Sequence, residues 1–176
     1  MSEDTATREP DFALRQSKRP RSVIAGPYGH PFHALLVTIP IGAWVASFVF
    51  DIVSVASGDA GAFGRGALWL IGIGLVGAVL AAVVGLIDLS GLAPGTRVRK
   101  IALTHMAINL TVVALFIVSF AIRAAAGYDP VNVPGIVVSV VALLALGVSG
   151  FLGGELAYRY GVRVADEETQ RTGFDT

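Results

Sequence analysis

The stretch GALWLIGIGLVGAVLAAVVGLIDL, residues 66–89, identifies the class of fold, because it contains a single charged residue in a run of 24. A helix of that length rises about 1.5 Å per residue and crosses the roughly 30 Å of a membrane's hydrocarbon core. Three further apolar stretches of similar length flank it, at residues 32–56, 101–125 and 134–158. The sequence therefore predicts an all-α membrane protein with four transmembrane helices.

The composition of the whole chain indicates the same class. Of its 176 residues, 54% are apolar and 15% are charged, whereas a soluble domain averages about 25% charged residues. A domain of this size could not bury such an apolar excess in water, which excludes an ordinary soluble enzyme and a disordered chain. The chain has no cysteine, which excludes thiol catalysis and iron–sulfur ligation. Its formal net charge is zero, so we expect no nucleic-acid partner.

The connections between the four stretches predict how the helices are arranged. Polar or glycine- and proline-rich connections of roughly ten residues force neighbouring helices to run antiparallel, which gives an up-down four-helix bundle. We expect this transmembrane domain at residues 26–164. A polar basic N-terminal tail should cover residues 1–25, and a polar C-terminal tail should cover residues 165–176.

Basic residues are distributed unevenly about the four stretches. Eleven of the 13 lysines and arginines lie in the two terminal segments or the second connection, and only Arg65 and Arg123 lie on the opposite side. Because Lys and Arg are enriched in cytoplasmic loops, we expect both termini to be cytoplasmic. The chain is then a multi-pass protein of a plasma membrane, with the lipid bilayer as its main partner.

Polar side chains gather at the cytoplasmic end of the predicted bundle. Ionisable groups inside a membrane are costly and usually mark a functional site. The other half of the spans offers only Asp51 and a few loop charges, among them Arg123. All four helices contribute to the cytoplasmic cluster, which comprises His30, His33, Asp88, His105, Asn109 and Glu155.

Three short motifs in and beside these helices carry a family resemblance. They are GHPFH at residues 29–33, GLID at residues 85–88 followed by His105 and Asn109, and GGELAYRYGV at residues 153–162. In this order they resemble the DUF2231 family of predicted bacterial integral membrane proteins, over roughly residues 26–164. Some members of that family are joined to a Rieske-type iron–sulfur domain. The resemblance therefore implies redox work, a Rieske-type redox partner and a bacterial plasma membrane.

The histidines suit an iron cofactor, because imidazole ligates haem iron. His33 and His105 lie on the first and third helices, which are diagonal partners in a four-helix bundle. With Asn109 one turn from His105, they form a candidate haem b site, and the three histidines of the chain allow at most one such haem. Gly42 and Gly85 near that level could admit a flat macrocycle, or could equally let the helices pack closely. This hypothesis makes the chain a non-catalytic electron-transfer subunit.

Two alternatives are open for the same cluster. A divalent transition metal could be bound by imidazole nitrogens and carboxylate oxygens. The other alternative is a membrane scaffold or assembly partner without a cofactor, in which the polar groups only tie the helix ends together. Either version is compatible with a homo-oligomer. The candidate metal ligands are His30, His33, Asp88, His105 and Glu155.

Proline also bears on the first span. Pro40 lies within the apolar stretch at residues 32–56 and has no N–H to donate. We therefore expect a kink in the first helix.

Overall fold

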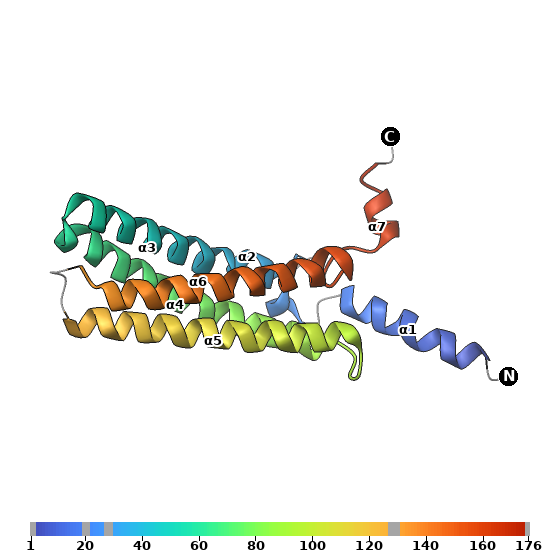
Figure 1. Cartoon of the computed structure of the whole chain (residues 1–176). Coiled ribbons are helices and arrows are strands. Elements are labelled where there is room, and N and C mark those ends of the chain that lie inside the picture. The colour runs from blue at the N-terminus through green and yellow to red at the C-terminus, as the bar shows by residue number, and fades with distance from the viewer. Residues whose placement is uncertain (1–2, 19–21, 27–29, 127–130, 175–176) are drawn as a thin grey trace.

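The computed structural model describes residues 3–18, 22–26, 30–126 and 131–174. The described residues form a bundle that consists of helices. The first span consists of α2 (Phe32–Leu36) and α3 (Thr38–Ser57), and α4 (Ala60–Ser90), α5 (Arg97–Ala126) and α6 (Val133–Gly154) supply the other three. Two terminal helices, α1 (Glu3–Lys18) and α7 (Glu167–Arg171), lie beyond the same end of the bundle (Figure 1). No strand occurs in the described residues, and the predicted all-α, four-span fold is confirmed.

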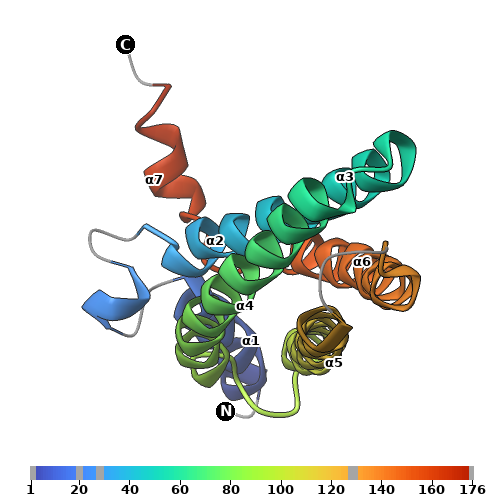
Figure 2. The same ribbon diagram turned by 90° about the vertical axis from the view of Figure 1, so that its left-hand side faces the viewer.

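The spans are arranged in a ring, in the order of the chain. Each of α3, α4, α5 and α6 packs against the helix before it and the helix after it, and α6 closes the ring against α3. Figure 2, which views the bundle from the end farthest from the termini, shows α3 close to α4 and α5 close to α6. The first and third spans are therefore diagonal partners, as expected for an up-down bundle.

The helices extend beyond the apolar stretches that predicted them. α4 begins at Ala60, where the side chain of Asp59 accepts the N–H of Ala62 at 3.0 Å. α5 begins at Arg97, and Thr96 Oγ1 accepts the N–H of Arg99 at 3.2 Å. Hydropathy marks the part of a helix that lies in lipid, whereas capping side chains mark where the helix begins.

The first span is interrupted one turn before its proline. Pro40 cannot donate to the carbonyl four residues earlier, which belongs to Leu36. α2 ends at Leu36 and α3 begins at Thr38, so the helix breaks where that carbonyl loses its donor. This interruption at Val37 separates the short helix that carries His33 from the rest of the span.

An aromatic pair from diagonal helices fills the centre of the bundle. The rings of Trp44 on α3 and Phe116 on α5 stack with centroids 4.1 Å apart and an angle of 13° between their planes. Trp44 Nε1 donates to the carbonyl oxygen of Ile71 on α4 at 3.3 Å, which satisfies the indole N–H away from water. Gly74 allows α4 to approach, because a β-carbon there would collide with the indole.

The outward faces of the bundle are apolar. Trp69, Leu144 and Phe151 are 68%, 69% and 72% exposed. Apolar surface of this extent marks contact with an apolar phase, and a helical backbone satisfies its own polar groups there. Each of the four spans is long and apolar enough to cross a membrane. The protein is therefore a multi-pass membrane protein.

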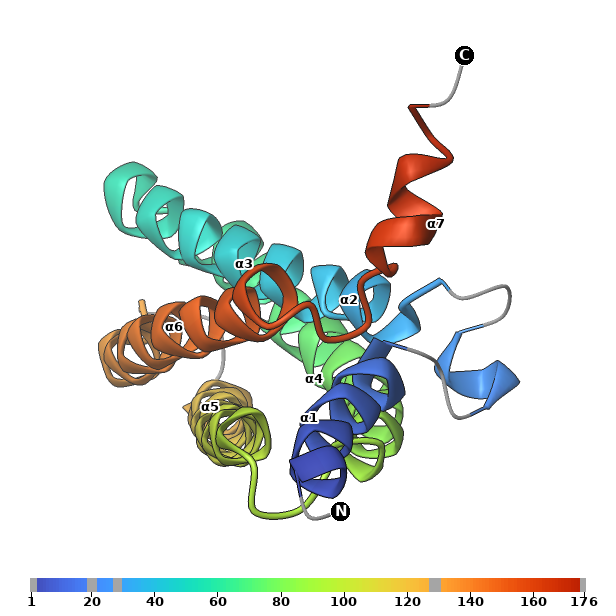
Figure 3. The ribbon, with the colours of Figure 1, turned by 90° about the vertical axis from the view of Figure 1, so that its right-hand side faces the viewer.

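The segment expected as an N-terminal tail is largely helical. Within residues 1–25, α1 is followed by a 3₁₀ turn, η1 (Val23–Ala25), whose Ala25 is fully buried. The carbonyl oxygen of Ser17, near the end of α1, accepts the N–H of Arg163 at 3.0 Å. The N-terminal and C-terminal segments therefore meet at the base of the bundle, where α1 and α7 lie in Figure 3.

Candidate functional site

Two imidazoles from diagonal spans meet near the end of the bundle that carries α1 and α7. His33 on α2 and His105 on α5 have ring centroids 6.5 Å apart, with an angle of 86° between the ring planes. Both side chains are half-buried. The prediction that these two histidines are neighbours across the bundle centre is confirmed.

Hydrogen bonds at Nδ1 determine which nitrogen of each ring carries the hydrogen. His33 Nδ1 lies 2.9 Å from the carbonyl oxygen of Ala81 on α4, and His105 Nδ1 lies 2.9 Å from that of Ser149 on α6. A carbonyl oxygen can only accept, so each Nδ1 donates. A neutral ring then has its lone pair at Nε2. This is the arrangement of a metal-binding histidine that a backbone carbonyl holds in place.

Asn109 and Ser149 complete the surroundings of His105. Asn109 Nδ2 donates to His105 Nε2 and to the backbone carbonyl of His105, both at 3.0 Å. Ser149 Oγ lies 2.9 Å from His105 Nδ1. The lone pair of His105 Nε2 is therefore used by Asn109, so another partner at Nε2 would have to displace this amide, which would keep the carbonyl of His105 as its other acceptor.

Two glycines allow the neighbouring helices to close on the imidazoles. A β-carbon at Gly85 on α4 would lie 2.9 Å from Cε1 of His33, and one at Gly153 on α6 would lie 3.2 Å from Cε1 of His105. Both separations are shorter than an optimal carbon–carbon contact of about 3.5–4.0 Å. At Gly42, by contrast, a β-carbon would have no other atom within 4 Å. Of the two glycines singled out in the sequence, only Gly85 touches a histidine.

The carboxylates of the predicted cluster are held by arginines. Asp88 Oδ1 lies 3.0 Å from Nε of Arg163, and Glu155 Oε1 accepts Nη1 of Arg159 at 2.8 Å. Glu155 begins a π-helical turn, η3 (Glu155–Arg159), that ends the fourth span. These acids are therefore engaged by side chains outside the histidine pair.

The structure therefore brings some of the predicted site residues together and leaves others apart. His33, His105 and Asn109 are brought together, whereas His30 is exposed at the edge of the bundle. Within the part of the chain that the structure describes, no group of three or more His, Asp or Glu side chains is placed to hold a metal ion. The five-residue metal set is therefore not assembled here, and metal binding stays a prediction.

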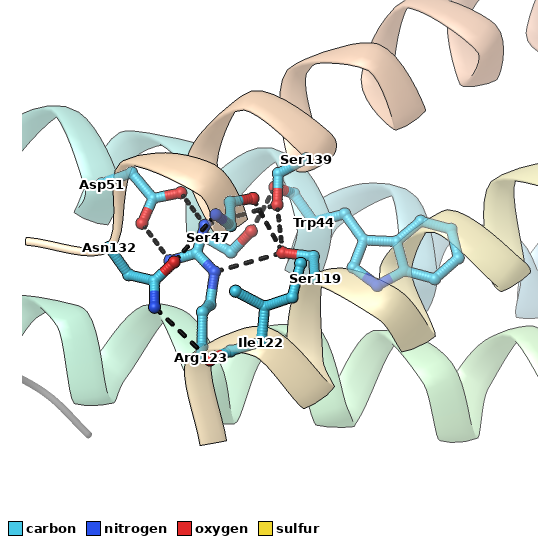
Figure 4. Close-up of polar contacts among 9 residues, drawn as sticks. Trp44, Ser47, Asp51, Ser119, Ile122, Arg123, Asn132 and Ser139 are labelled. Atoms are coloured by element: carbon cyan, nitrogen blue, oxygen red, sulfur yellow. Dashed lines mark hydrogen bonds and ion pairs between the residues drawn. The ribbon is translucent and has the colours of Figure 1, made fainter. Parts of the chain in front are cut away.

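A second polar cluster lies in the opposite half of the bundle (Figure 4). Arg123 on α5 binds Asp51 on α3 with both terminal nitrogens, Nη1 to Oδ1 at 2.6 Å and Nη2 to Oδ2 at 2.8 Å. The two side chains are 5% and 2% exposed. Arg123 Nε donates to Ser119 Oγ at 3.1 Å, and Ser119 Oγ lies 2.9 Å from Ser139 Oγ.

This cluster corrects the expectation that Arg123 is a loop charge. α5 continues to Ala126, so Arg123 lies in its last turn, inside the bundle. The spacing between each of these charges and an aromatic residue of the same helix already indicates the inward position. Asp51 follows Trp44 by seven residues, and Arg123 follows Phe116 by seven. Seven residues make nearly two turns, so each charge shares the inward face of its helix with a central aromatic residue.

The motifs of the sequence fall on the histidine pair and on the turns beside it. A family model described as a predicted membrane protein, DUF2231, matches residues 29–166, which include all four spans. The chain belongs to the DUF2231 family. No curated protein and no solved structure shows significant similarity to the chain. Membership in DUF2231 agrees with the multi-pass fold and does not itself name a ligand.

Proposed function

We propose that this DUF2231 protein is a membrane electron-transfer subunit that holds one haem b between His33 and His105. The pairing of these imidazoles carries the proposal, since their centroids lie 6.5 Å apart and each Nδ1 donates to a backbone carbonyl. Metal–nitrogen bonds of about 2 Å on both sides place two ring centres joined through one ion roughly 6 Å apart. The observed separation suits two ligands of a single iron.

The number of protein donors favours haem over a bare metal ion. An ion held by protein alone usually needs three or four protein ligands. Haem supplies its own equatorial nitrogens, so two histidines are sufficient. Asp88 and Glu155 are held in ion pairs with arginines, so either would have to leave its partner to bind an ion.

The protein's own contribution is to position the two rings. The carbonyls of Ala81 and Ser149 orient the imidazoles, and the amide of Asn109 has the backbone carbonyl of His105 as its other acceptor. A haem held by His33 and His105 would supply single-electron transfer, which supports a non-catalytic role. We infer a Rieske-type protein as the redox partner, and a bacterial plasma membrane with both termini cytoplasmic.

The test is the visible spectrum of the protein purified in detergent from haem-replete cells. We expect a Soret band and, by the pyridine haemochrome assay, about one haem per chain, because the histidines form one pair. His33→Ala and His105→Ala should each lose much of the haem, since each variant removes one of its two protein ligands. His30→Ala is the matched control, because His30 is exposed and outside the pair.

A colourless wild-type protein from these cells would overturn the haem proposal. Elemental analysis of that protein would then distinguish the two alternatives. A bound transition metal that both histidine variants lose would establish the metal-ion version. Metal-free protein whose histidine variants are only less stable would support an assembly role without a cofactor.

A further inference from the structure

Arg163 adopts an unfavourable backbone conformation where the two ends of the chain meet. Its φ is 61°, in the left-handed region that residues other than glycine rarely adopt. Its N–H donates to the carbonyl oxygen of Ser17 at 3.0 Å, which holds this conformation in place. Strain of this kind concentrates at functional sites. Glycine would be less strained at this position, so the presence of an arginine indicates that its side chain is needed there.

The guanidinium of Arg163 is buried and incompletely paired. Its side chain is 8% exposed, and Nη2 donates to the carbonyl oxygen of Ala25 at 2.8 Å. Nε lies 3.0 Å from Asp88 Oδ1, in an ion pair that is not aligned as a hydrogen bond. Nη1 is buried and has no hydrogen-bond partner among the described residues. A buried charged donor without an acceptor is strongly unfavourable, so this atom is a candidate to bind a ligand or an ordered water.

The charges around Arg163 favour an anion. Lys18 lies beside the same turn, with Nζ 3.1 Å from the position of a β-carbon at Gly161. Lys18 and Arg163 therefore bring two positive charges to the turn at residues 161–163, and Asp88 supplies a carboxylate to Arg163 alone. Glu155, in the preceding turn, is already paired with Arg159.

We propose that Nη1 of Arg163 binds an anionic oxygen group, a carboxylate or a phosphate, brought to this end of the bundle by the cofactor or by a membrane lipid. Asp88 lies one turn beyond Gly85, which touches His33, so the arginine adjoins the histidine site. The cofactor source rests on the proposed function, because haem b carries two carboxylates. The lipid source is independent of it, because anionic headgroups lie at the membrane surface.

The test compares Arg163→Gln with Arg159→Gln. Both variants remove one positive charge from the C-terminal turns, but Arg159 is 64% exposed and is paired with Glu155. Two quantities are measured on each purified protein, the haem retained after washing and the phosphatidylglycerol retained in native mass spectra. Arg163→Gln should weaken retention of one of them by about 10–100-fold, as expected for loss of a charge-assisted hydrogen bond. Arg159→Gln should retain both.

The pattern of loss identifies the source of the anion. Loss of haem with unchanged lipid indicates a cofactor carboxylate, and loss of lipid with unchanged haem indicates a lipid phosphate. If the wild-type protein holds no haem, the proposed function fails while the lipid measurement still tests Arg163. Retention of both by Arg163→Gln, or of neither by the wild type, would overturn the inference.

A double variant separates anion binding from simple neutralisation of Asp88. Asp88→Asn combined with Arg163→Gln leaves neither charge unpaired, so it removes the main reason for misfolding. If Arg163 binds the anion, the double variant should lack it as Arg163→Gln does. Recovery of wild-type haem and lipid in the double variant would show that Arg163 only balances Asp88.

Discussion

Asp51 and Arg123 place opposite charges in the interior of the bundle, with 2% and 5% of their side chains exposed. Each charge alone would carry a large desolvation penalty there. Two parallel hydrogen bonds, supplemented by Ser119 and Ser139, satisfy the guanidinium. The pair joins diagonal helices. It stabilises the bundle only while both partners are present, because either charge alone would be buried without a counter-charge.

We therefore expect Asp51→Asn to lower the free energy of unfolding by about 3–5 kcal/mol, because it leaves Arg123 buried and unpaired. The double variant Asp51→Leu/Arg123→Met should lose much less, since it buries no charge. Chemical unfolding in detergent, followed by circular dichroism, measures both.

The exposed pair of Arg159 and Glu155 provides the comparison. Breaking it with Arg159→Gln should change stability by less than about 1 kcal/mol, because Arg159 is mostly in solvent. An effect of Asp51→Asn no larger than this one would show that the buried pair does not hold the helices together.

At the scale of elements, the contact between α2 and α4 decides whether His33 can reach His105. The break before Pro40 makes α2 a separate helix of five residues, and His33 is its second residue. α4 approaches this short helix through Gly85 and supplies the carbonyl of Ala81 to the ring. The position of His33 therefore depends on a glycine in another span.

Gly85→Ala should displace the His33 ring, because the added β-carbon would lie 2.9 Å from Cε1. Overpacking of this kind costs about 1–3 kcal/mol of stability, and the haem content should fall with it. Thermal unfolding and the Soret absorbance provide the two measurements.

Gly42→Ala is the matched substitution, since no atom lies within 4 Å of a β-carbon there. It should leave haem content unchanged and stabilise α3 by up to about 1 kcal/mol, because alanine favours helix more than glycine does. Equal effects of the two alanine substitutions would contradict the role assigned to Gly85.

At the scale of the whole molecule, the bundle has two chemically different ends. The end that carries α1 and α7 also carries the histidine pair, and the α3–α4 connection lies at the opposite end (Figure 1). The distribution of Lys and Arg predicts that the first of these ends faces the cytoplasm.

Cysteine labelling tests this orientation directly, because the chain has no cysteine of its own. Ser57 and Ser90 are exposed at opposite ends of the bundle, as the last residues of α3 and α4. An impermeant maleimide added to intact cells should label Ser57→Cys, whereas Ser90→Cys should be labelled only after the cells are opened. The opposite pattern would reverse the topology and place the histidine pair on the outer side.

The class of protein, the number of spans and the family can all be read from the amino-acid sequence alone. A lipid bilayer requires about 20 consecutive apolar residues for each crossing, and such a run can be recognised in one stretch of sequence without knowledge of the fold. The position of each polar residue within its span also predicts that the three histidines lie near one end. Helix ends are less well predicted, because α4 and α5 continue past the apolar stretches to capping residues outside them.

Which polar groups meet depends on the tertiary structure. Hydropathy states which residues can lie in a membrane, but the inward face of each helix depends on how it rotates against its neighbours. His33 therefore pairs with His105 while His30 stays exposed, and Asp88 faces Arg163. Arg123 resembles a loop charge because it lies near the end of its apolar stretch, and its partner Asp51, 72 residues away, is identified only in the folded bundle. The long α5 helix and the packing of diagonal helices bring that pair inside the bundle.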